Sequence, residues 1–498
     1  MGIAVRVSRR LFLGALLGSV AGQALANAPL TSLRPLPRAT DFHKRTARPA
    51  DTVIAEAKLT GKVGFVVADA RTGEVLEARN PLLGQPPASV TKAITALYAL
   101  DRLGPDFRYH TRLIADGTLR NGRLTGNLAL VGSGDPTLDT DALGEMAQQL
   151  KASGLREVTG KFLVCGGGFA SIRSIDPDQA DHVGYNPAIS GLNLNYNRVH
   201  FEWKRQAGDY TLTLDARARK FAPQVTVAKM RVVDRAAPVY TYAEQGGTDH
   251  WTVARGALGK AGSRWLPVRQ PELYTAEVFQ TLARSHGIAL GRGAVVDTPP
   301  EGAVLVDHAS APLKEILRGM LKYSTNLTAE VVGLTASATD GSGTRSLRAS
   351  AEAMNDWVHQ ELGARRAGFV DHSGLGGASR IAASDMVRAL VRVHGNGLLE
   401  GILKEISMRD AKGKVIPDHP IRVRAKTGTL NFASALAGYM AGPDGRPLAF
   451  AIFAADVPRR NKIRKSDGDI PEGTAAWTAR ARRMHLQLIE RWGTAYGS

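Results

Sequence analysis

The chain contains very little cysteine and no long internal hydrophobic run. Cys165 is the only cysteine among 498 residues, so an internal disulfide is excluded and stability must come from packing. Its position in FLVCGGGF is typical of a buried strand that ends in a glycine turn. No stretch of about 20 unbroken apolar residues occurs beyond the N-terminus, which argues against an internal membrane span. Internal repeats and low-complexity tracts are also absent.

The sequence also lacks the G-x-S-x-G motif of serine hydrolases that use a Ser-His-Asp triad. His372 and Ser373 are neighbours within DHSGLGGAS, and such adjacent residues are more typical of a loop than of a triad. The apolar fraction of 44% and the charged fraction of 22% fit a soluble globular protein. A length of 498 residues suffices for two or three domains.

Residues 1–26 resemble an export signal. Three arginines precede a short apolar stretch, and Ala-Leu-Ala at its end fits a cleavage site. The run SRRLFL also matches the twin-arginine export pattern. We therefore expect a periplasmic protein that is exported by the twin-arginine route, with a proline-rich basic linker at residues 27–50. The alternative is a buried N-terminal helix.

The chain is strongly basic, with a formal net charge of +18. Residues 1–26 hold three arginines and no acid, so their removal leaves +15. Such a surplus attracts polyanions, and for an exported protein these are the anionic cell wall and membrane surfaces rather than nucleic acid. The simpler interpretation is that the charge only maintains solubility.

The order of expected elements indicates one domain interrupted by an insertion. From residue 62, KVGFVVADARTGEVLEARN reads as two strands joined by a turn that contains Gly73. PPASVTKAITALYAL, residues 86–100, then begins a helix, and after about residue 303 further helices precede strands such as RVRAKTGTL and LAFAIFAAD. We expect a mixed α/β (α+β) fold in which the early hairpin and the late strands form one antiparallel sheet.

Three short motifs occur once each along the chain. They are Ser89-Val90-Thr91-Lys92, Ser324-Thr325-Asn326 and Lys426-Thr427-Gly428. Each has a plain structural interpretation: a helix cap at Ser89 or Ser324, or a solvated charge at Lys92 or Lys426. Their combination instead points to nucleophilic catalysis, because a serine hydroxyl reacts only when a base removes its proton.

Helix geometry places Lys92 one turn from Ser89, within reach of its hydroxyl. Lys92 can act as the general base only when neutral, which requires burial or a nearby cation such as Lys426. Ser324 would relay a proton to the leaving amine. Asn326 would bind a substrate amide.

The strand that follows Lys426 would complete the site. The backbone N–H groups of Ser89 and Thr429 would form the oxyanion hole. Gly428 would let a substrate backbone lie close against the strand. No metal and no cofactor are needed for this chemistry.

The order of the three motifs resembles that of the low-molecular-mass class C penicillin-binding proteins, the D-alanyl-D-alanine carboxypeptidase/endopeptidase family. The resemblance extends over LGPDFRYHTRL, GRLTGNLALVGSGDPTL, NPAISGLNLNYNRV, DHSGLGGASRI and KTGTLNFASALAGYM. Ser324 lies 235 residues after Ser89, and a long insertion between these motifs is typical of this family.

The resemblance implies a serine β-lactamase/penicillin-binding-protein-like transpeptidase domain with two smaller inserted domains. Residues 51–104 and 303–498 would form the catalytic domain, residues 105–125 and 186–302 a β-rich domain, and residues 126–185 a small α/β domain.

The resemblance also implies the reaction. Ser89 would form an acyl-enzyme with peptidoglycan stem peptides, release D-alanine and be acylated by β-lactams. Lys426, Thr427 and Thr429 would hold the substrate carboxylate.

Two departures from the family pattern bear on specificity. Cys165 stands where relatives carry an aspartate thought to face the amino group of the substrate's diamino acid, which puts D,D-endopeptidase activity in doubt. The loop DHSGLGGASR replaces a shorter form. The alternatives to a carboxypeptidase are a β-lactamase or esterase on the same core, and a non-catalytic cell-wall binding module.

Overall fold

The computed structural model describes residues 47–340, 346–464 and 468–497. The predicted signal peptide and nearly all of the linker at 27–50 lie outside these residues. Residues 47–498 form one compact unit. Within its described part, no helix is both long and apolar enough to cross a bilayer.

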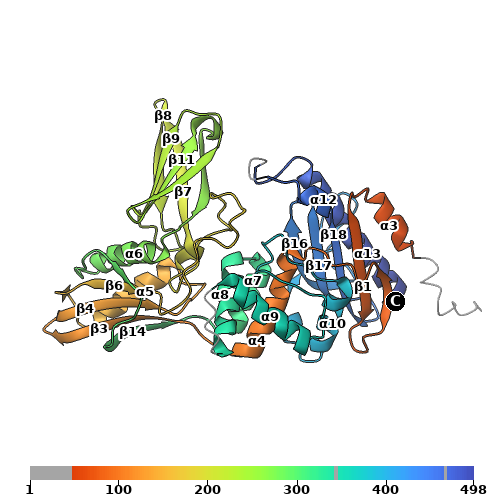
Figure 1. The fold of residues 1–498 in the computed structure, drawn as a ribbon, viewed down its shortest axis with the longest axis horizontal. Coiled ribbons are helices and arrows are strands. Elements are labelled where there is room, and N and C mark those ends of the chain that lie inside the picture. Colours follow the sequence, from red (N-terminus) through yellow and green to blue (C-terminus); the bar gives the residue numbers. More distant parts are fainter. Residues whose placement is uncertain (1–46, 341–345, 465–467, 498) are drawn as a thin grey trace, which may run out of the picture. The chain divides into compact units, whose positions relative to one another are not determined.

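An antiparallel sheet of six strands forms the centre of the catalytic part (Figure 1). The strand order is β15-β16-β17-β18-β1-β2. The bounds are β1 Lys62–Asp69, β2 Val75–Arg79, β15 Lys404–Glu405, β16 Arg422–Leu430, β17 Ala433–Ala441 and β18 Pro447–Ala455. Because β1 pairs along its whole length with β18, the predicted union of the early hairpin with the late strands is confirmed.

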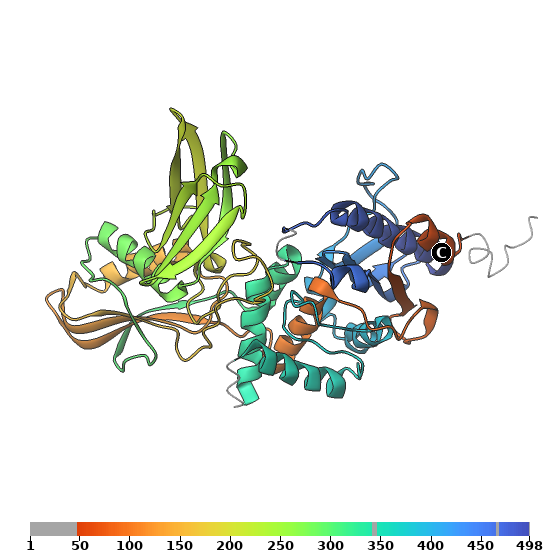
Figure 2. The same cartoon turned by 45° about the horizontal axis from the view of Figure 1, so that its top comes forward.

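Helices cover both faces of this sheet (Figures 1 and 2). Side chains alternate along β1, so Phe65 and Val67 face one helical layer while Val66 and Ala68 face the other. The first layer contains α3 Ala50–Glu56 and α13 Thr474–Tyr496. The second contains α4 Thr91–Leu103, α7 Leu313–Tyr323, α8 Asn326–Ser337, α9 Leu347–Glu361, α10 Ala383–His394 and α11 Leu398–Ile402. The short helix α12, Val457–Arg460, follows β18.

A second sheet lies in the inserted region, with the order β13-β6-β4-β3-β14 and β5 beside β4. Its bounds are β3 His110–Arg120, β4 Arg123–Gly132, β5 Glu157–Val158, β6 Phe162–Cys165, β13 Ala294–Val296 and β14 Ala303–Ala309. Helices α5 Thr140–Ala152 and α6 Pro271–Ser285 share its apolar core.

Strand pairing in this second sheet crosses the domain boundaries expected from the sequence. β3 pairs with β4 over ten positions, although the expected boundary falls after residue 125. β14 pairs with β3, although it begins at 303, where the catalytic domain was expected to resume. The domain division remains a prediction, and the pairing favours grouping residues 105–125 and 303–309 with the α/β insertion.

Two three-stranded sheets make up the β-rich part of the insertion. Their orders are β12-β7-β8 and β10-β11-β9. The bounds are β7 Arg198–Gln206, β8 Asp209–Asp215, β9 Ala228–Val233, β10 Tyr240–Gln245, β11 Thr248–Ala254 and β12 Ala261–Pro267.

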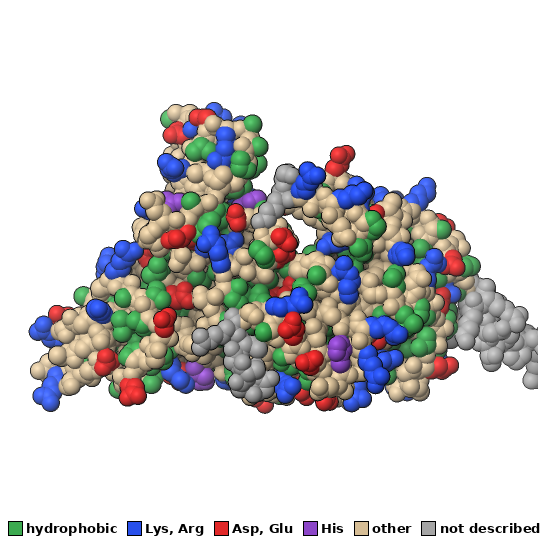
Figure 3. All heavy atoms as spheres, viewed as in Figure 1, with side chains coloured by type: hydrophobic (Ala, Val, Ile, Leu, Met, Phe, Trp, Pro, Cys, Tyr) green, Lys and Arg blue, Asp and Glu red, His purple; other side chains and the backbone are tan. Residues whose placement is uncertain are grey.

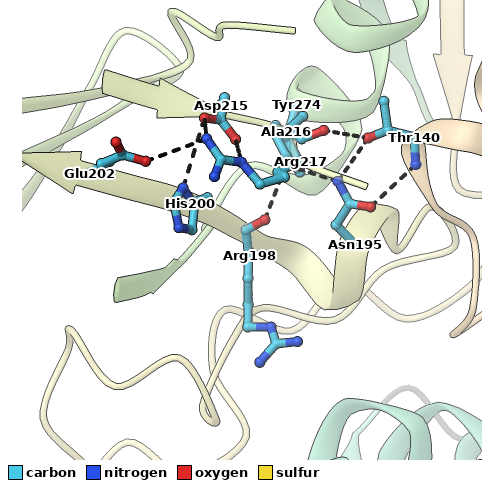
Figure 4. A network of polar contacts seen from close by, with 9 residues as sticks. All are labelled: Thr140, Asn195, Arg198, His200, Glu202, Asp215, Ala216, Arg217 and Tyr274. Carbon is cyan, nitrogen blue, oxygen red and sulfur yellow. Dashed lines mark hydrogen bonds and ion pairs between the residues drawn. The ribbon is translucent and has the colours of Figure 1, made fainter. Parts of the chain in front are cut away.

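A polar network joins the β-rich sheets to helices α5 and α6 (Figure 4). The Asn195 amide nitrogen donates to the Thr140 hydroxyl at 2.8 Å, and that hydroxyl donates to the carbonyl of Ala216 at 2.7 Å. The Tyr274 hydroxyl donates to the carbonyl of Arg198 at 3.0 Å. Asn195 has a φ of 50°, a left-handed conformation that asparagine tolerates better than most residues. The network therefore fixes where β7 starts and β8 ends.

Candidate active site

Ser89 lies in a short 3₁₀ turn, Ala88–Val90, that leads directly into α4. Pro86 and Pro87 precede the turn and restrict the backbone before it. Lys92, in the first turn of α4, donates from Nζ to Ser89 Oγ at 3.0 Å. The serine and lysine of the first motif are thus in direct contact, as the three-residue spacing predicts.

Lys92 is fully buried and makes three hydrogen bonds. Besides Ser89 Oγ, its Nζ donates to Asn326 Oδ1 at 2.8 Å and to the carbonyl of Ser373 at 2.7 Å. Burial lowers the pKa of Lys92, and the nearby carboxylates of Glu330 and Asp371 partly oppose this effect. The lowered pKa makes the neutral amine, which can accept the Ser89 proton, more accessible than in an ordinary lysine.

The second motif joins helices α7 and α8. Ser324 follows the last residue of α7 and adopts φ 61° and ψ 37°, a left-handed conformation uncommon for a serine. Asn326 begins α8, and its Nδ2 donates to the carbonyl of Tyr185 at 3.0 Å. Both ends of the Asn326 amide are therefore bonded within the protein, to Lys92 and to Tyr185, whereas the sequence predicts a substrate amide as its partner.

The third motif lies on β16, at the edge of the same site. Lys426 is buried, and its Nζ donates to Ser324 Oγ at 2.9 Å and to the carbonyl of Thr427 at 2.8 Å. Burial lowers the pKa of Lys426, and the charge of Lys92 lowers it further. The three motifs thus form two contacting pairs, Lys92 with Ser89 and Lys426 with Ser324.

Gly428 allows β16 to approach the turn that carries Ser89. A Cβ atom at position 428 would lie 2.5 Å from the carbonyl oxygen of Pro87 and 3.1 Å from the Cβ of Ala88. Real Cβ atoms essentially never approach another heavy atom closer than 3.0 Å. The contact that requires glycine here is thus with the protein's own backbone.

The motifs open into one cavity of about 720 Å³. Ser89, Ser324, Asn326 and Thr429 all line it. The Thr429 hydroxyl accepts a hydrogen bond from Arg482 of α13 at 3.1 Å. The cavity therefore presents the hydroxyl groups of Ser89, Ser324 and Thr429 and the cation of Arg482 to whatever it binds.

A buried acidic group supports Lys92, and the motif search misses it. Glu330 is fully buried, and its carboxylate accepts the backbone N–H groups of His372 and Ser373, each at 2.9 Å. Asp371 accepts the N–H groups of Gly374 at 2.7 Å and Gly376 at 2.6 Å. Burial raises the pKa of both carboxyl groups. These contacts hold the loop whose Ser373 carbonyl accepts from Lys92. The sequence feature that could have pointed to Glu330 is that it is the only charged residue in the helix NLTAEVVGLTAS.

Cys165 is buried at the end of β6, and its thiol contacts the carbonyl of Asp297 at 3.5 Å. It does not line the cavity, whereas Asp176, Asp178 and Asp469 do. Within the described part of the chain, no three His, Cys, Asp or Glu side chains are grouped as metal ligands would be.

Sequence comparison identifies the family of this site. Residues 47–470 match the model of the D-Ala-D-Ala carboxypeptidase 3 (S13) family. The chain belongs to this family. The predicted relationship to penicillin-binding carboxypeptidases and the predicted enzymatic function, a D-Ala-D-Ala carboxypeptidase, are therefore confirmed.

Individual relatives of this S13 chain support the family assignment. A D-alanyl-D-alanine carboxypeptidase from Actinomadura sp. (strain R39) is 30% identical over 448 residues, covering 81% of this chain and 79% of the relative. The carboxypeptidase DacB of Haemophilus influenzae is 26% identical over 411 residues, covering 78% and 85%. The crystal structure of penicillin-binding protein 4 from Haemophilus influenzae superposes with a TM-score of 0.71 at 19% identity, covering 88% of this chain and 99% of that one. The predicted fold class is thus confirmed.

Proposed function

We propose that Ser89 is the nucleophile of a D-Ala-D-Ala carboxypeptidase that acts on peptidoglycan stem peptides. The observation that carries the proposal is the 3.0 Å contact of Lys92 Nζ with Ser89 Oγ inside the cavity. Family membership supports the type of reaction, and the residue roles below are our assignment.

Acylation begins with neutral Lys92. Its amine accepts the proton of Ser89 Oγ, and Oγ attacks the carbonyl carbon of the penultimate D-alanine. The N–H groups of Ser89 and Thr429 stabilise the oxyanion that forms. During this proton transfer the Lys92 amine stays hydrogen-bonded, because Asn326 Oδ1 and the Ser373 carbonyl accept the other hydrogens on its Nζ.

Collapse of the tetrahedral intermediate breaks the peptide bond and leaves an acyl-serine. The leaving nitrogen takes a proton from Ser324, whose Oγ already accepts from Lys426 and so has its own hydrogen free to donate. The Lys92 ammonium replaces the proton that Ser324 loses and is neutral again. Neutral Lys92 then accepts a proton from the water that attacks the ester, and it passes this proton to Ser89 Oγ as the acyl–oxygen bond breaks, which regenerates Ser89. This cycle needs no metal or cofactor.

The terminal carboxylate of the substrate binds at the β16 side of the cavity. Thr429 lines the cavity there, Thr427 is exposed on the same strand, and Arg482 adds a positive charge next to the Thr429 hydroxyl. Lys426 lies behind them. A β-lactam antibiotic has a strained amide bond and carries a carboxylate in the corresponding place. β-Lactams would therefore acylate Ser89 in the same way.

Export completes the proposal. Residues 1–26 carry the features of a twin-arginine signal, which would place the enzyme in the periplasm, where its peptidoglycan substrate is found. The basic surface suits contact with an anionic cell wall.

The test is release of D-alanine from a synthetic acyl-D-Ala-D-Ala peptide. Ser89→Ala is expected to lower kcat by about 10⁴-fold or more with unchanged stability, since it removes the nucleophile. Ser384→Ala is the matched control, because the Ser384 hydroxyl is buried on α10 without a hydrogen-bond partner and does not line the cavity. Full activity of the Ser89 variant would refute the assignment. A digest of purified sacculi, separated by chromatography, would then show whether cross-links are cut as well.

A further inference from the structure

A loop of the insertion borders the cavity and contacts the second motif. The 172–189 loop leaves and returns at one point, because Ile172 and Ile189 form an antiparallel bridge with N–H···O distances of 2.9 and 2.8 Å. Several of its residues line the cavity, namely Asp176, Asp178, Gln179, Ala180 and Tyr185. The Tyr185 carbonyl accepts a hydrogen bond from Asn326 Nδ2 at 3.0 Å. The loop thus supplies the backbone group that binds one end of the Asn326 amide.

Arg269 holds this loop from inside the protein. It lies between β12 and α6, and its side chain is buried. Its guanidinium donates to the carbonyls of Arg173 and Asn186, each at 2.8 Å, and to that of Asp181 at 2.9 Å. These carbonyls come from the start, the end and the middle of the 172–189 loop. Because the donors of a guanidinium are fixed in one plane, Arg269 determines where the three parts of the loop lie.

The β-rich part of the insertion fixes the position of Arg269 in turn. Asp249, a fully buried residue of β11, accepts the backbone N–H of Arg269 at 2.8 Å and the Tyr242 hydroxyl at 2.8 Å. Lys and Arg side chains are visible on the surface of the β-rich part (Figure 3), but Arg269 is only 7% exposed. Its guanidinium therefore serves the loop carbonyls rather than an anion from solution.

The orientation of the Asn326 amide bears directly on the general base. Asn326 Oδ1 accepts from Lys92 Nζ at 2.8 Å, while Nδ2 donates to the Tyr185 carbonyl. A carbonyl oxygen can only accept, so it selects the NH₂ end of the amide and leaves the oxygen end for Lys92. If the loop moved away, the amide could turn round and present its NH₂ group to the lysine. Lys92 would then lose an acceptor.

We propose that Arg269 is a positioning residue for the general base, Lys92. It holds the 172–189 loop so that the Tyr185 carbonyl orients the Asn326 amide. The series of contacts begins on β11 and ends at the nucleophile's lysine, which gives the β-rich insertion a part in acylation. The inference rests on the proposed role of Lys92 as the base.

The test is a double-mutant cycle on the second-order rate constant of acylation by a fluorescent penicillin. Arg269→Gln is expected to lower this constant about tenfold, since a displacement of 1 Å caused far from the reacting atoms can cost about 100-fold. In an Asn326→Ala background the same change should cost less than about twofold, because no amide remains to be misoriented. Arg388→Gln is the matched control and should stay within about twofold of the wild type. Arg388 also donates to a backbone carbonyl, that of Gly363 at 2.7 Å, but it is exposed and does not line the cavity.

The pH profile provides a readout that loss of stability alone would not move. The hydrogen bond to Asn326 Oδ1 favours the charged form of Lys92, so its loss should lower the Lys92 pKa further. The rise of the acylation rate with pH should therefore move to lower pH in Arg269→Gln and not in the control. The carboxylates of Glu330 and Asp371, which raise the Lys92 pKa, are present in every variant.

Asn186→Ala is a second variant that leaves Arg269 intact. The Asn186 side chain accepts from the N–H of Asp176 at 2.9 Å and donates to its carbonyl at 2.8 Å, so its removal loosens the 172–189 loop from within. It should show the same two effects at smaller size, and it decides the matter should Arg269→Gln not fold. Equal losses in both backgrounds of the cycle, an unchanged rate, or a slower variant with an unmoved pH profile would overturn the role of Arg269. Absence of any penicillin adduct in the wild type would instead refute the proposed function itself.

Discussion

The close contact between β16 and the Ser89 turn makes Gly428 a sensitive position. In Gly428→Ala, the new Cβ would lie 2.5 Å from the Pro87 carbonyl oxygen and 3.1 Å from the Cβ atoms of Ala88 and Ala435. The strand and the turn must then separate by at least about 0.5 Å to reach the 3.0 Å that real Cβ atoms keep. All three neighbouring atoms belong to the backbone or to alanine methyl groups, so none of them can rotate away.

We expect two consequences of this separation. Overpacking of this kind typically costs about 1–3 kcal/mol of unfolding free energy. Displacing the nucleophile by 1 Å can cost about 100-fold in rate, so a shift of about half that should lower the acylation rate constant roughly tenfold. The expected loss of activity thus comes from the distance between the Ser89 turn and β16, while every catalytic side chain remains present.

The measurements are acylation by a fluorescent penicillin and urea unfolding. Gly319→Ala, the same substitution at a position of α7 with no heavy atom within 4 Å of the new Cβ, is the control and should keep full activity. If Gly428→Ala acylates at the wild-type rate and unfolds at the wild-type urea concentration, the close packing described here is not present.

Three further substitutions test the electrostatics. Glu330→Gln removes a negative charge near Lys92, so the Lys92 pKa should fall further and the rise of acylation rate with pH should move to lower pH; a move to higher pH would contradict this. His485 is buried neutral with its pKa lowered to about 3, so it contributes stability above pH 6.5 that is lost as the pH falls. Urea unfolding of His485→Gln should therefore vary less with pH than that of the wild type, by about 1.4 kcal/mol per pH unit between pH 6 and 4, and parallel curves would count against burial as the cause. Arg482→Gln removes the donor to Thr429 and should raise the KM for D-Ala-D-Ala peptides about three- to tenfold with little change in kcat; an unchanged KM would show that this cation does not reach the substrate.

The central sheet and the contacts within each motif follow from local patterns in the sequence. The three-residue spacing of Ser89 and Lys92 places them in contact at the start of a helix, and the hairpin from residue 62 reads as two strands joined by a glycine turn. The convergence of the three motifs in one site was expected only because they occur in a familiar order, and the bond of Lys426 to Ser324 was not predicted.

The parts that were not predicted depend on contacts distant in the sequence. The carboxylate of Glu330 binds backbone groups more than 40 positions away, and no local pattern specifies such a partner. Ser324 is left-handed at the end of α7, and its Oγ accepts from Lys426, 102 positions later in the chain. The pairing of β3 with β14 likewise closes a sheet over nearly 200 residues, which strand propensity alone does not indicate.

The most direct test of the account is to locate the covalent bond that penicillin forms. The intact protein is incubated with benzylpenicillin, its mass is measured, and the adduct is mapped after digestion to peptides. A single penicilloyl group on the peptide that contains Ser89, absent in Ser89→Ala, is the predicted result. An adduct on another side chain, or one that persists in Ser89→Ala, would contradict the central claim that this serine and its buried lysine perform the reaction.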